Sequence, residues 1–257
     1  MPKTGGRVNK IRPPQTRDGK VSGIMRPMSC CEESGKPGLR PYAELLSLYF
    51  ALPAFLTLVR LRFRAFPVIP VLWLAMIPLA AWLVRRRGFS PLAVLGVGNA
   101  AVSERRLVAT FLRAVPAAVV LVALLGRIHP EWLFSFVSSH ANFWLVVMFA
   151  YPVLSVVPQG VIYRAFFRER YAALFPDKTV RMLVATACFS FCHVFFLNPW
   201  ALLLTFAGGM MFWRTYEKTG SLLLANLEHA LYGDLVFTIG YGAFLYHGTM
   251  ALANAPA

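Results

Sequence analysis

The chain has 257 residues, of which 58% are hydrophobic and only 14% are charged, and its mean hydropathy is +0.58. Soluble domains carry about 25% charged residues, so the composition excludes an ordinary soluble globular protein. The formal net charge is +15. Nine of the 26 basic residues lie before Pro41, and most of the others lie in short runs between apolar stretches, as topology signals of membrane proteins do. This distribution argues against a nucleic-acid partner.

The first part of the chain is polar and rich in Pro, Gly, Lys and Arg. It offers little surface to bury, so we expect a disordered basic tail over residues 1–42. After it we expect transmembrane helices in two groups, residues 43–139 and residues 140–257, and the second group contains the polar residues considered below.

Apolar segments follow the tail, and a membrane span needs about 20 mostly apolar residues. The segments are 43–59, 66–84, 108–126, 142–163, 180–197, 199–213 and 220–246. The sequence therefore predicts an all-α fold, a polytopic helical transmembrane bundle of about seven spans, with six to eight left open.

Three of these segments contain or adjoin prolines or glycines that should alter the helix. The first is short and contains Pro53, so an interfacial helix is an alternative to a span. Asn198-Pro199 predicts a tight reversal with proline at a helix start. Glycines in the last segment predict a bent or broken helix; they are Gly233, Gly240 and Gly242.

The positive runs predict the orientation of the bundle. With the tail inside, the cytoplasmic side receives Arg85 to Arg87, Arg105-Arg106, the stretch from Arg164 to Arg181, and Arg214 with Lys218. Arg127 and the arginines of residues 60–64 are the exceptions. We expect an integral multi-pass protein, with its N-terminus in the cytoplasm, in a bacterial inner membrane.

Polar residues within apolar segments are the candidates for function, because an ionisable group near the bilayer centre costs about 2.5–3.5 kcal/mol on insertion scales. They lie on three helices of the C-terminal half. They are Gln159, Arg164, His193, Asn226, Glu228, His229 and Asp234.

Helical spacing sorts these residues into faces, because residues three or four apart are neighbours. Phe189 should lie under His193, and Gly160 under Arg164. We expect one cavity with Arg164 and Glu228 at its edge. Its other members are expected to be His193, His229 and Asn226.

Each polar residue also has a structural interpretation. Either histidine can simply bond a neighbouring helix, Arg164 can extend to the cytoplasmic surface, and Glu228 can form a purely structural pair with Arg164. Their occurrence together on neighbouring helices favours a functional site.

Three short motifs in this half resemble those of the CPBP family of intramembrane proteases, which includes the CAAX prenyl endopeptidases and bacteriocin-immunity relatives. The family motifs are Glu-Glu-x-x-x-Arg, Phe-x-x-x-His and His-x-x-x-Asn. Here the corresponding runs are Gln159 to Arg164, Phe189 to His193, and His229 to Gly233. The resemblance covers roughly residues 140–248 and implies that residues 140–257 form a CPBP-like core.

The chain also departs from these motifs. Gln159 and Gly160 stand where the family has glutamates, and Gly233 stands where it has asparagine. In the family a glutamate and a histidine are thought to activate a water, while histidine and asparagine stabilise the oxyanion. A glutamine can orient a water but cannot take its proton.

The resemblance implies roles for the remaining residues. His193 and His229 would bind the water or the oxyanion, Gln159 would orient the water, and Arg164 would hold the helix geometry. Asn226 and Phe189 would contact the substrate or the oxyanion. We further expect Glu228 to pair with Arg164 and to double as a base.

No cofactor is firmly implied, since the family has been described both as metal-dependent and as metal-free. A zinc ion, if bound, would use His193 and His229, which fall short of the three protein ligands of a catalytic zinc site. Cys188 and Cys192 share a face beside His193, and a helix contact explains them better than metal ligation.

The leading function is an intramembrane endopeptidase of the CPBP type that hydrolyses peptide bonds near the cytoplasmic face, with impaired activity left open. Its partners would be membrane lipids and a peptide or membrane-protein substrate. The alternative is an inactive pseudoprotease, a membrane binding or immunity-type protein. A transporter or a membrane acyltransferase is a third class, without an internal repeat or any motif in its favour.

Overall fold

The computed structural model describes residues 38–63, 66–94 and 104–245. Every regular element in these ranges is a helix and none is a strand, which confirms the all-α prediction. Of the tail predicted for residues 1–42, residues 1–37 lie outside these ranges. Its last residues, 39–42, are the first turn of a helix, so the boundary of that tail was placed too late.

Several helices follow one another without a break and differ only in their local winding. The elements in chain order are α1 Leu39–Leu46, the π-helical η1 Ser47–Ala51, α2 Leu52–Arg62, α3 Val68–Arg87, α4 Pro91–Val94, α5 Glu104–Ile128, the 3-10 turn η2 Pro130–Trp132, α6 Ser135–Ser139, α7 Ala141–Tyr151, the π-helical η3 Pro152–Val156, α8 Val157–Gly160, the π-helical η4 Val161–Phe166, α9 Phe167–Tyr171, α10 Lys178–Phe191, the 3-10 turn η5 Cys192–Phe196, α11 Pro199–Thr219, α12 Leu222–Ile239 and α13 Gly242–Leu245.

In the described part of the chain, six helices are long and apolar enough to cross a membrane. They are Leu39–Arg62, Val68–Arg86, Glu104–Ile128, Ala141–Tyr171, Lys178–Phe196 and Leu222–Ile239. Apolar side chains such as Phe111, Val115 and Val119 are about 60% exposed on α5, as lipid contact requires. The chain is an integral multi-pass membrane protein, within the predicted range of spans.

The first and the sixth predicted segments need separate comment. The first forms a continuous helix of 24 residues, long enough to span, in which Pro53 lies in the first turn after the π-helical stretch. Proline has no amide hydrogen, so Pro53 removes one hydrogen bond from this continuous helix, directly after the π-helical turn η1, where the regular bonding already changes. The segment 199–213 forms α11, which is not among the six and carries Arg214, Glu217 and Lys218 near its end.

The sequence sets the boundaries of the C-terminal helices through capping side chains. Asp177 accepts a hydrogen bond from the Val180 amide (2.8 Å), Asn198 from Ala201 (2.9 Å) and Ser221 from Leu224 (3.2 Å). These bonds satisfy amides that have no partner within the helix. The reversal predicted at Asn198-Pro199 is confirmed.

The last segment breaks at one of its three glycines. Helix α12 continues through Gly233 and ends at Gly240, whose φ of +123° is accessible to few residues other than glycine. A Cβ at Gly240 would also lie 2.1 Å from the Trp132 carbonyl oxygen. The predicted break is therefore confirmed, and it lies after α12 and not inside it.

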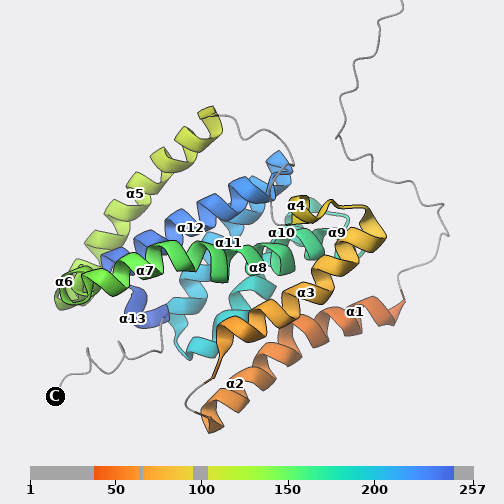
Figure 1. Cartoon of the computed structure of the whole chain (residues 1–257), viewed down its shortest axis with the longest axis horizontal. Coiled ribbons are helices and arrows are strands. Elements are labelled where there is room, and N and C mark those ends of the chain that lie inside the picture. Colours follow the sequence, from red (N-terminus) through yellow and green to blue (C-terminus); the bar gives the residue numbers. More distant parts are fainter. Residues whose placement is uncertain (1–37, 64–65, 95–103, 246–257) are drawn as a thin grey trace, which may run out of the picture. The chain divides into compact units, whose positions relative to one another are not determined.

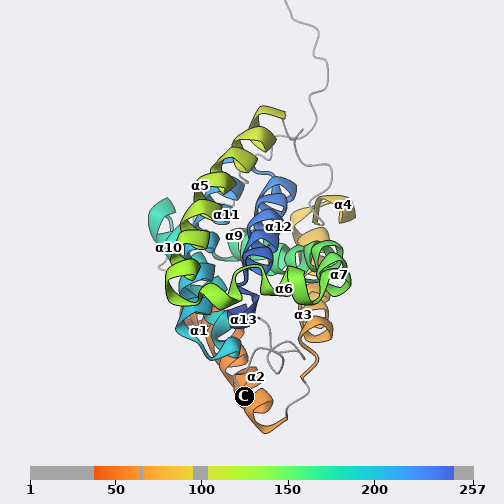
Figure 2. The ribbon, with the colours of Figure 1, turned by 90° about the vertical axis from the view of Figure 1, so that its left-hand side faces the viewer.

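Helix α12 contacts more of the C-terminal half than its neighbours do. It packs against α5 and α11, and also against α7, η3 and α8 (Figures 1 and 2). Helix α10 packs along α11, and α3 packs on α8 and η4. Polar groups of α12 and of the helix Ala141–Tyr171 therefore face one another inside the bundle.

The first helix supports the π-helical turn η4. Tyr49 is almost fully buried, and its hydroxyl donates a hydrogen bond to the Ile162 carbonyl oxygen (2.8 Å). Its ring also packs edge-on against Tyr163, Phe167 and Tyr171. A hydrogen bond from another helix can satisfy a carbonyl where regular winding is interrupted. Tyr49 thus helps to fix the backbone two residues before Arg164.

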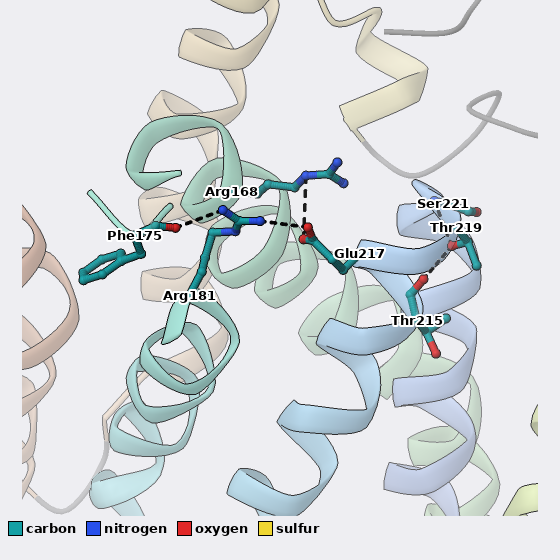
Figure 3. A network of polar contacts seen from close by, with 7 residues as sticks. All are labelled: Arg168, Phe175, Arg181, Thr215, Glu217, Thr219 and Ser221. Atoms are coloured by element: carbon teal, nitrogen blue, oxygen red, sulfur yellow. Dashed lines mark hydrogen bonds and ion pairs between the residues drawn. The ribbon is translucent and has the colours of Figure 1, made fainter. Parts of the chain in front are cut away.

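A polar network joins the ends of α9, α10 and α11 (Figure 3). The carboxylate of Glu217 accepts a hydrogen bond from Arg181 (2.9 Å) and lies 3.9 Å from Arg168. Arg181 also donates to the Phe175 carbonyl oxygen (3.0 Å). Because the Arg181 side chain is only 10% exposed, it needs this partner to offset its desolvation.

We therefore expect Glu217→Gln to lower the free energy of unfolding by about 2 kcal/mol, the scale of a hydrogen bond to a charged group. Thermal unfolding of the purified protein in detergent measures the change. The control is Lys218→Gln, an exposed neighbour on the same helix. Equal midpoints for the two variants would contradict a stabilising role for the network.

Candidate functional site

A buried arginine lies at the centre of the candidate site. Arg164 lies in η4 and is 3% exposed. Its guanidinium donates to Asn226 Oδ1 (3.2 Å) and lies 3.2 Å from His229 Nδ1. The rings of Phe189 and Phe212 lie 5.6 and 5.2 Å from it, in the range of cation–π contacts. In the described part of the chain, Arg164 has no ion pair with a carboxylate.

The predicted pairing of Glu228 with Arg164 is wrong. Glu228 is fully buried, but it lies on the α12 face toward α5, where Arg113 Nη2 is 3.1 Å from its carboxylate. Residues 226 and 229 face Arg164, and residue 228 is turned about 100° away from residue 229. Glu228 therefore joins α12 to α5, and its expected role as a base stays a prediction.

Asn226 occupies the space that Gly160 leaves empty. A Cβ at Gly160 would lie 2.1 Å from Asn226 Oδ1 and 2.8 Å from its Nδ2, both closer than real contacts allow. The amide oxygen of Asn226 therefore reaches Arg164 through the position where the family has a glutamate side chain. A neutral acceptor from α12 thus takes the place of a carboxylate that, in the family motif, comes from the helix of the arginine itself.

The two neighbours of His229 determine which of its ring nitrogens carries the proton. An arginine only donates hydrogen bonds, so Nδ1 accepts from Arg164 and the ring proton resides on Nε2. Nε2 lies 3.2 Å from the Tyr151 hydroxyl oxygen and donates to it. The hydroxyl proton of Tyr151 then remains available for another acceptor.

Tyr151 fills the space at the second departure from the family motifs. A Cβ at Gly233 would lie 2.4 Å from both Cε1 and the hydroxyl oxygen of Tyr151. The tyrosine hydroxyl thus reaches the region where the family has its asparagine side chain. At both glycines, a side chain from another helix supplies the missing polar group.

His193 follows Phe189 as predicted, and its orientation is fixed by the backbone. Its Nδ1 lies 2.8 Å from the Phe189 carbonyl oxygen, so Nδ1 carries the proton and donates. The Nε2 lone pair is then free to accept. The ring of Phe189 contacts both histidines, with centroid distances of 4.9 Å to His193 and 5.4 Å to His229.

Two further polar atoms are buried without a hydrogen-bond partner. The Gln159 amide donates to the Ser155 hydroxyl (2.7 Å), and its Oε1 is unpaired. Asn226 Nδ2 is likewise unpaired, next to the Gly160 backbone. A buried polar group without a partner is costly, and a bound water or substrate would satisfy it. Gln159 Oε1 offers such a ligand an acceptor, and Asn226 Nδ2 offers it a donor.

The residues do not fit a catalytic zinc ion. Both ring nitrogens of His229 are engaged, and the Arg164 guanidinium would repel a cation at this position. Within residues 38–63, 66–94 and 104–245, no three His, Cys, Asp or Glu side chains gather as metal ligands. Cys192 Sγ instead lies against the Phe189 carbonyl oxygen (3.0 Å).

Sequence reasoning missed three residues of this region. Tyr151, Phe212 and Arg113 contact His229, Arg164 and Glu228 respectively. The glycines that replace motif residues were a usable signal, because each leaves a volume that some other side chain must fill. Arg113 was a charge inside an apolar segment, although it was not counted among the polar candidates.

The fold and the site define a membrane protein in which motif residues from neighbouring helices meet around a buried arginine. Residues 140–233 match the family model described as "Type II CAAX prenyl endopeptidase Rce1-like". The match covers just over a third of the chain and includes all three motifs. The predicted resemblance to the CAAX prenyl endopeptidases is confirmed over residues 140–233.

Comparison with curated proteins and with solved structures gives no match. The match to a CAAX prenyl endopeptidase model agrees with the membrane environment that the apolar helices indicate.

The contact between Gly160 and Asn226 can be tested by a double-mutant cycle. Gly160→Ala should cost about 1–3 kcal/mol, because its Cβ overlaps the Asn226 amide. Asn226→Ala removes the overlap, so the double variant should lose less than the sum of the two single losses, by about 0.5–3 kcal/mol. Thermal or chemical unfolding in detergent measures all four proteins. Additive losses would show that the two positions do not interact.

Proposed function

We propose that this protein is an intramembrane endopeptidase of the Rce1-like type, in which His193 acts as the base in place of the motif glutamates. It hydrolyses peptide bonds near the cytoplasmic membrane face. The single observation that carries the proposal is the fixed orientation of His193. Its Nδ1 donates to the Phe189 carbonyl oxygen, so Nε2 presents a lone pair. A neutral imidazole of this kind is the commonest general base.

The unpaired atoms of the site supply the remaining roles. Gln159 Oε1 accepts a hydrogen bond from the attacking water and orients it. As the water oxygen bonds to the carbonyl carbon of the substrate, its proton passes to His193 Nε2. The oxyanion that forms accepts hydrogen bonds from the Tyr151 hydroxyl and from Asn226 Nδ2. When the C–N bond breaks, His193 returns the proton to the leaving nitrogen.

Arg164 and His229 position these donors. Arg164 fixes the Asn226 amide through Oδ1, which directs Nδ2 away from the guanidinium. His229 holds the Tyr151 hydroxyl oxygen, which directs the hydroxyl proton elsewhere. Because no carboxylate contributes, we expect hydrolysis to be slow. A positioned general base contributes about 10²–10⁴-fold, and a histidine alone supplies only part of what a glutamate and a histidine supply together.

The cytoplasmic placement rests on the distribution of positive charge. Arg40, Arg86, Arg170 and Lys218 all lie on the side of the bundle where α1 begins, if each helix crosses once. The cytoplasmic N-terminus and the bacterial inner membrane remain predictions on this basis.

A second candidate function is binding without catalysis, as in a pseudoprotease. It is favoured by the same replacements at Gly160 and Gly233, because Asn226 and Tyr151 fill both spaces with neutral side chains where the family has catalytic polar groups. Such a protein would bind a membrane partner through the retained fold and would not cleave it.

We expect purified protein in detergent to cleave members of a broad peptide library, and we expect His193→Ala to reduce the rate at least about 100-fold. His140→Ala is the matched control, since His140 is exposed at the start of α7 and distant in sequence from the motifs. Mass spectrometry of the products measures cleavage. A folded wild-type protein without any cleavage would favour the binding function, and an active His193→Ala variant would remove His193 as the base.

Tyr151→Phe separates oxyanion stabilisation from packing. The variant keeps the ring that packs against Gly233 and loses only the hydroxyl, so we expect kcat to fall about 10²–10³-fold with little change in KM. Because His229 loses the acceptor of its Nε2–H, the free energy of unfolding should fall by about 1–3 kcal/mol. Tyr42→Phe, at an exposed position of α1, is the control. An unchanged kcat would show that the hydroxyl does not act in the transition state.

A further inference from the structure

A groove away from the candidate site lies between α1, α3 and the end of the helix that contains Arg164. Its volume is about 900 Å³, within the range of small-molecule sites. Three arginines, Arg40, Arg86 and Arg170, line one part of it, and its apolar lining includes Leu79, Trp82 and Phe166. The groove is therefore amphipathic.

The only acidic side chain among the lining residues is already neutralised. Glu44 accepts two hydrogen bonds from Arg170, at 2.8 and 2.5 Å, and a third from the Tyr171 hydroxyl at 3.1 Å. Arg40 and Arg86 make no hydrogen bond or ion pair with any residue of the described ranges, although Arg40 is near enough to Glu44 to stabilise its charge. Two positive charges of the groove thus lack a bonded counter-ion, which favours an anionic ligand.

The apolar lining indicates that this ligand is also partly hydrocarbon. Trp82 packs edge-on against Phe166, with a centroid distance of 5.2 Å. Arg40 lies at the start of α1, and Arg86 and Arg170 lie near the ends of α3 and α9. The charges are therefore at helix ends, and the apolar lining residues lie farther along the helices, away from those ends. A tryptophan below a basic helix end is typical of the membrane interface.

We propose that this groove binds the phosphate headgroup of an anionic phospholipid of the surrounding leaflet. Arg86 and Arg40 donate to the phosphate, and one acyl chain lies along Leu79, Trp82 and Phe166. Basic pockets between transmembrane helices on the cytoplasmic side bind such headgroups. The binding does not require that the protein be a protease.

Thermal unfolding of the full-length protein in detergent tests the proposal. Added phosphatidylglycerol should raise the unfolding midpoint, whereas the same mole fraction of phosphatidylcholine should not. Arg86→Gln and Arg40→Gln should each weaken the apparent affinity for phosphatidylglycerol about fivefold, which is the effect of one arginine near an anionic surface. The control is Arg85→Gln, which removes the same charge from the exposed neighbour of Arg86 and should leave the affinity unchanged.

Two outcomes would overturn the proposal. Equal effects of Arg85→Gln and Arg86→Gln would mean that general surface charge, and not the groove, attracts the lipid. An equal rise of the midpoint with inorganic phosphate alone would mean that the ligand is a free anion without a hydrocarbon chain.

Fluorescence provides a second measurement that does not depend on the stability of the arginine variants. Phosphatidylglycerol brominated on its acyl chains should quench the emission of Trp82, and the quenched fraction should fall in Trp82→Phe. Equal quenching in the two proteins would exclude an acyl chain in the groove.

Discussion

A positive charge buried inside the helical bundle is the constraint on which the rest of the site depends. Among the residues that the structure describes, the partners of Arg164 are neutral acceptors and aromatic faces, and none is an ion-paired carboxylate. Each of these acceptors must present a lone pair, and so the orientation of Asn226 and the tautomer of His229 follow from Arg164. Those orientations in turn decide which polar hydrogens are left for a ligand. In the proposed mechanism, Arg164 thus organises the site without contacting the substrate.

Much of this arrangement could be predicted from the sequence, because helical periodicity fixes which residues share a face. The contact of Phe189 with His193, and the common approach of Asn226 and His229 to Arg164, follow from spacings of three and four residues. The partners of these faces could not be predicted. Tyr151 and Phe212 come from helices whose packing depends on the tertiary fold, and a periodic pattern does not specify which neighbour a face meets.

The prediction for Glu228 was wrong for a related reason. Charge complementarity alone favoured Arg164 as its partner, but an α-helix turns about 100° per residue, so neighbours in sequence point to different helices. Glu228 meets α5, and Arg113 was not weighed as its partner. The result is a separation of charge and chemistry in α12. One face carries a structural ion pair and the next carries the neutral groups of the candidate site, so a change at one need not alter the other.

The π-helical turn at Val161–Phe166 has a consequence for the length of the first motif. In an α-helix, residues five apart point about 140° away from each other, whereas in i→i+5 geometry they complete about one turn. Most of the step from Gln159 to Arg164 lies in this wider turn, so the two can serve the same side of the helix. The number of residues between them, together with the winding of the turn, therefore decides whether Gln159 and Arg164 face the same side. The loss of one of them would keep Gln159 on that side only if the turn returned to ordinary winding, because residues four apart are neighbours in an α-helix.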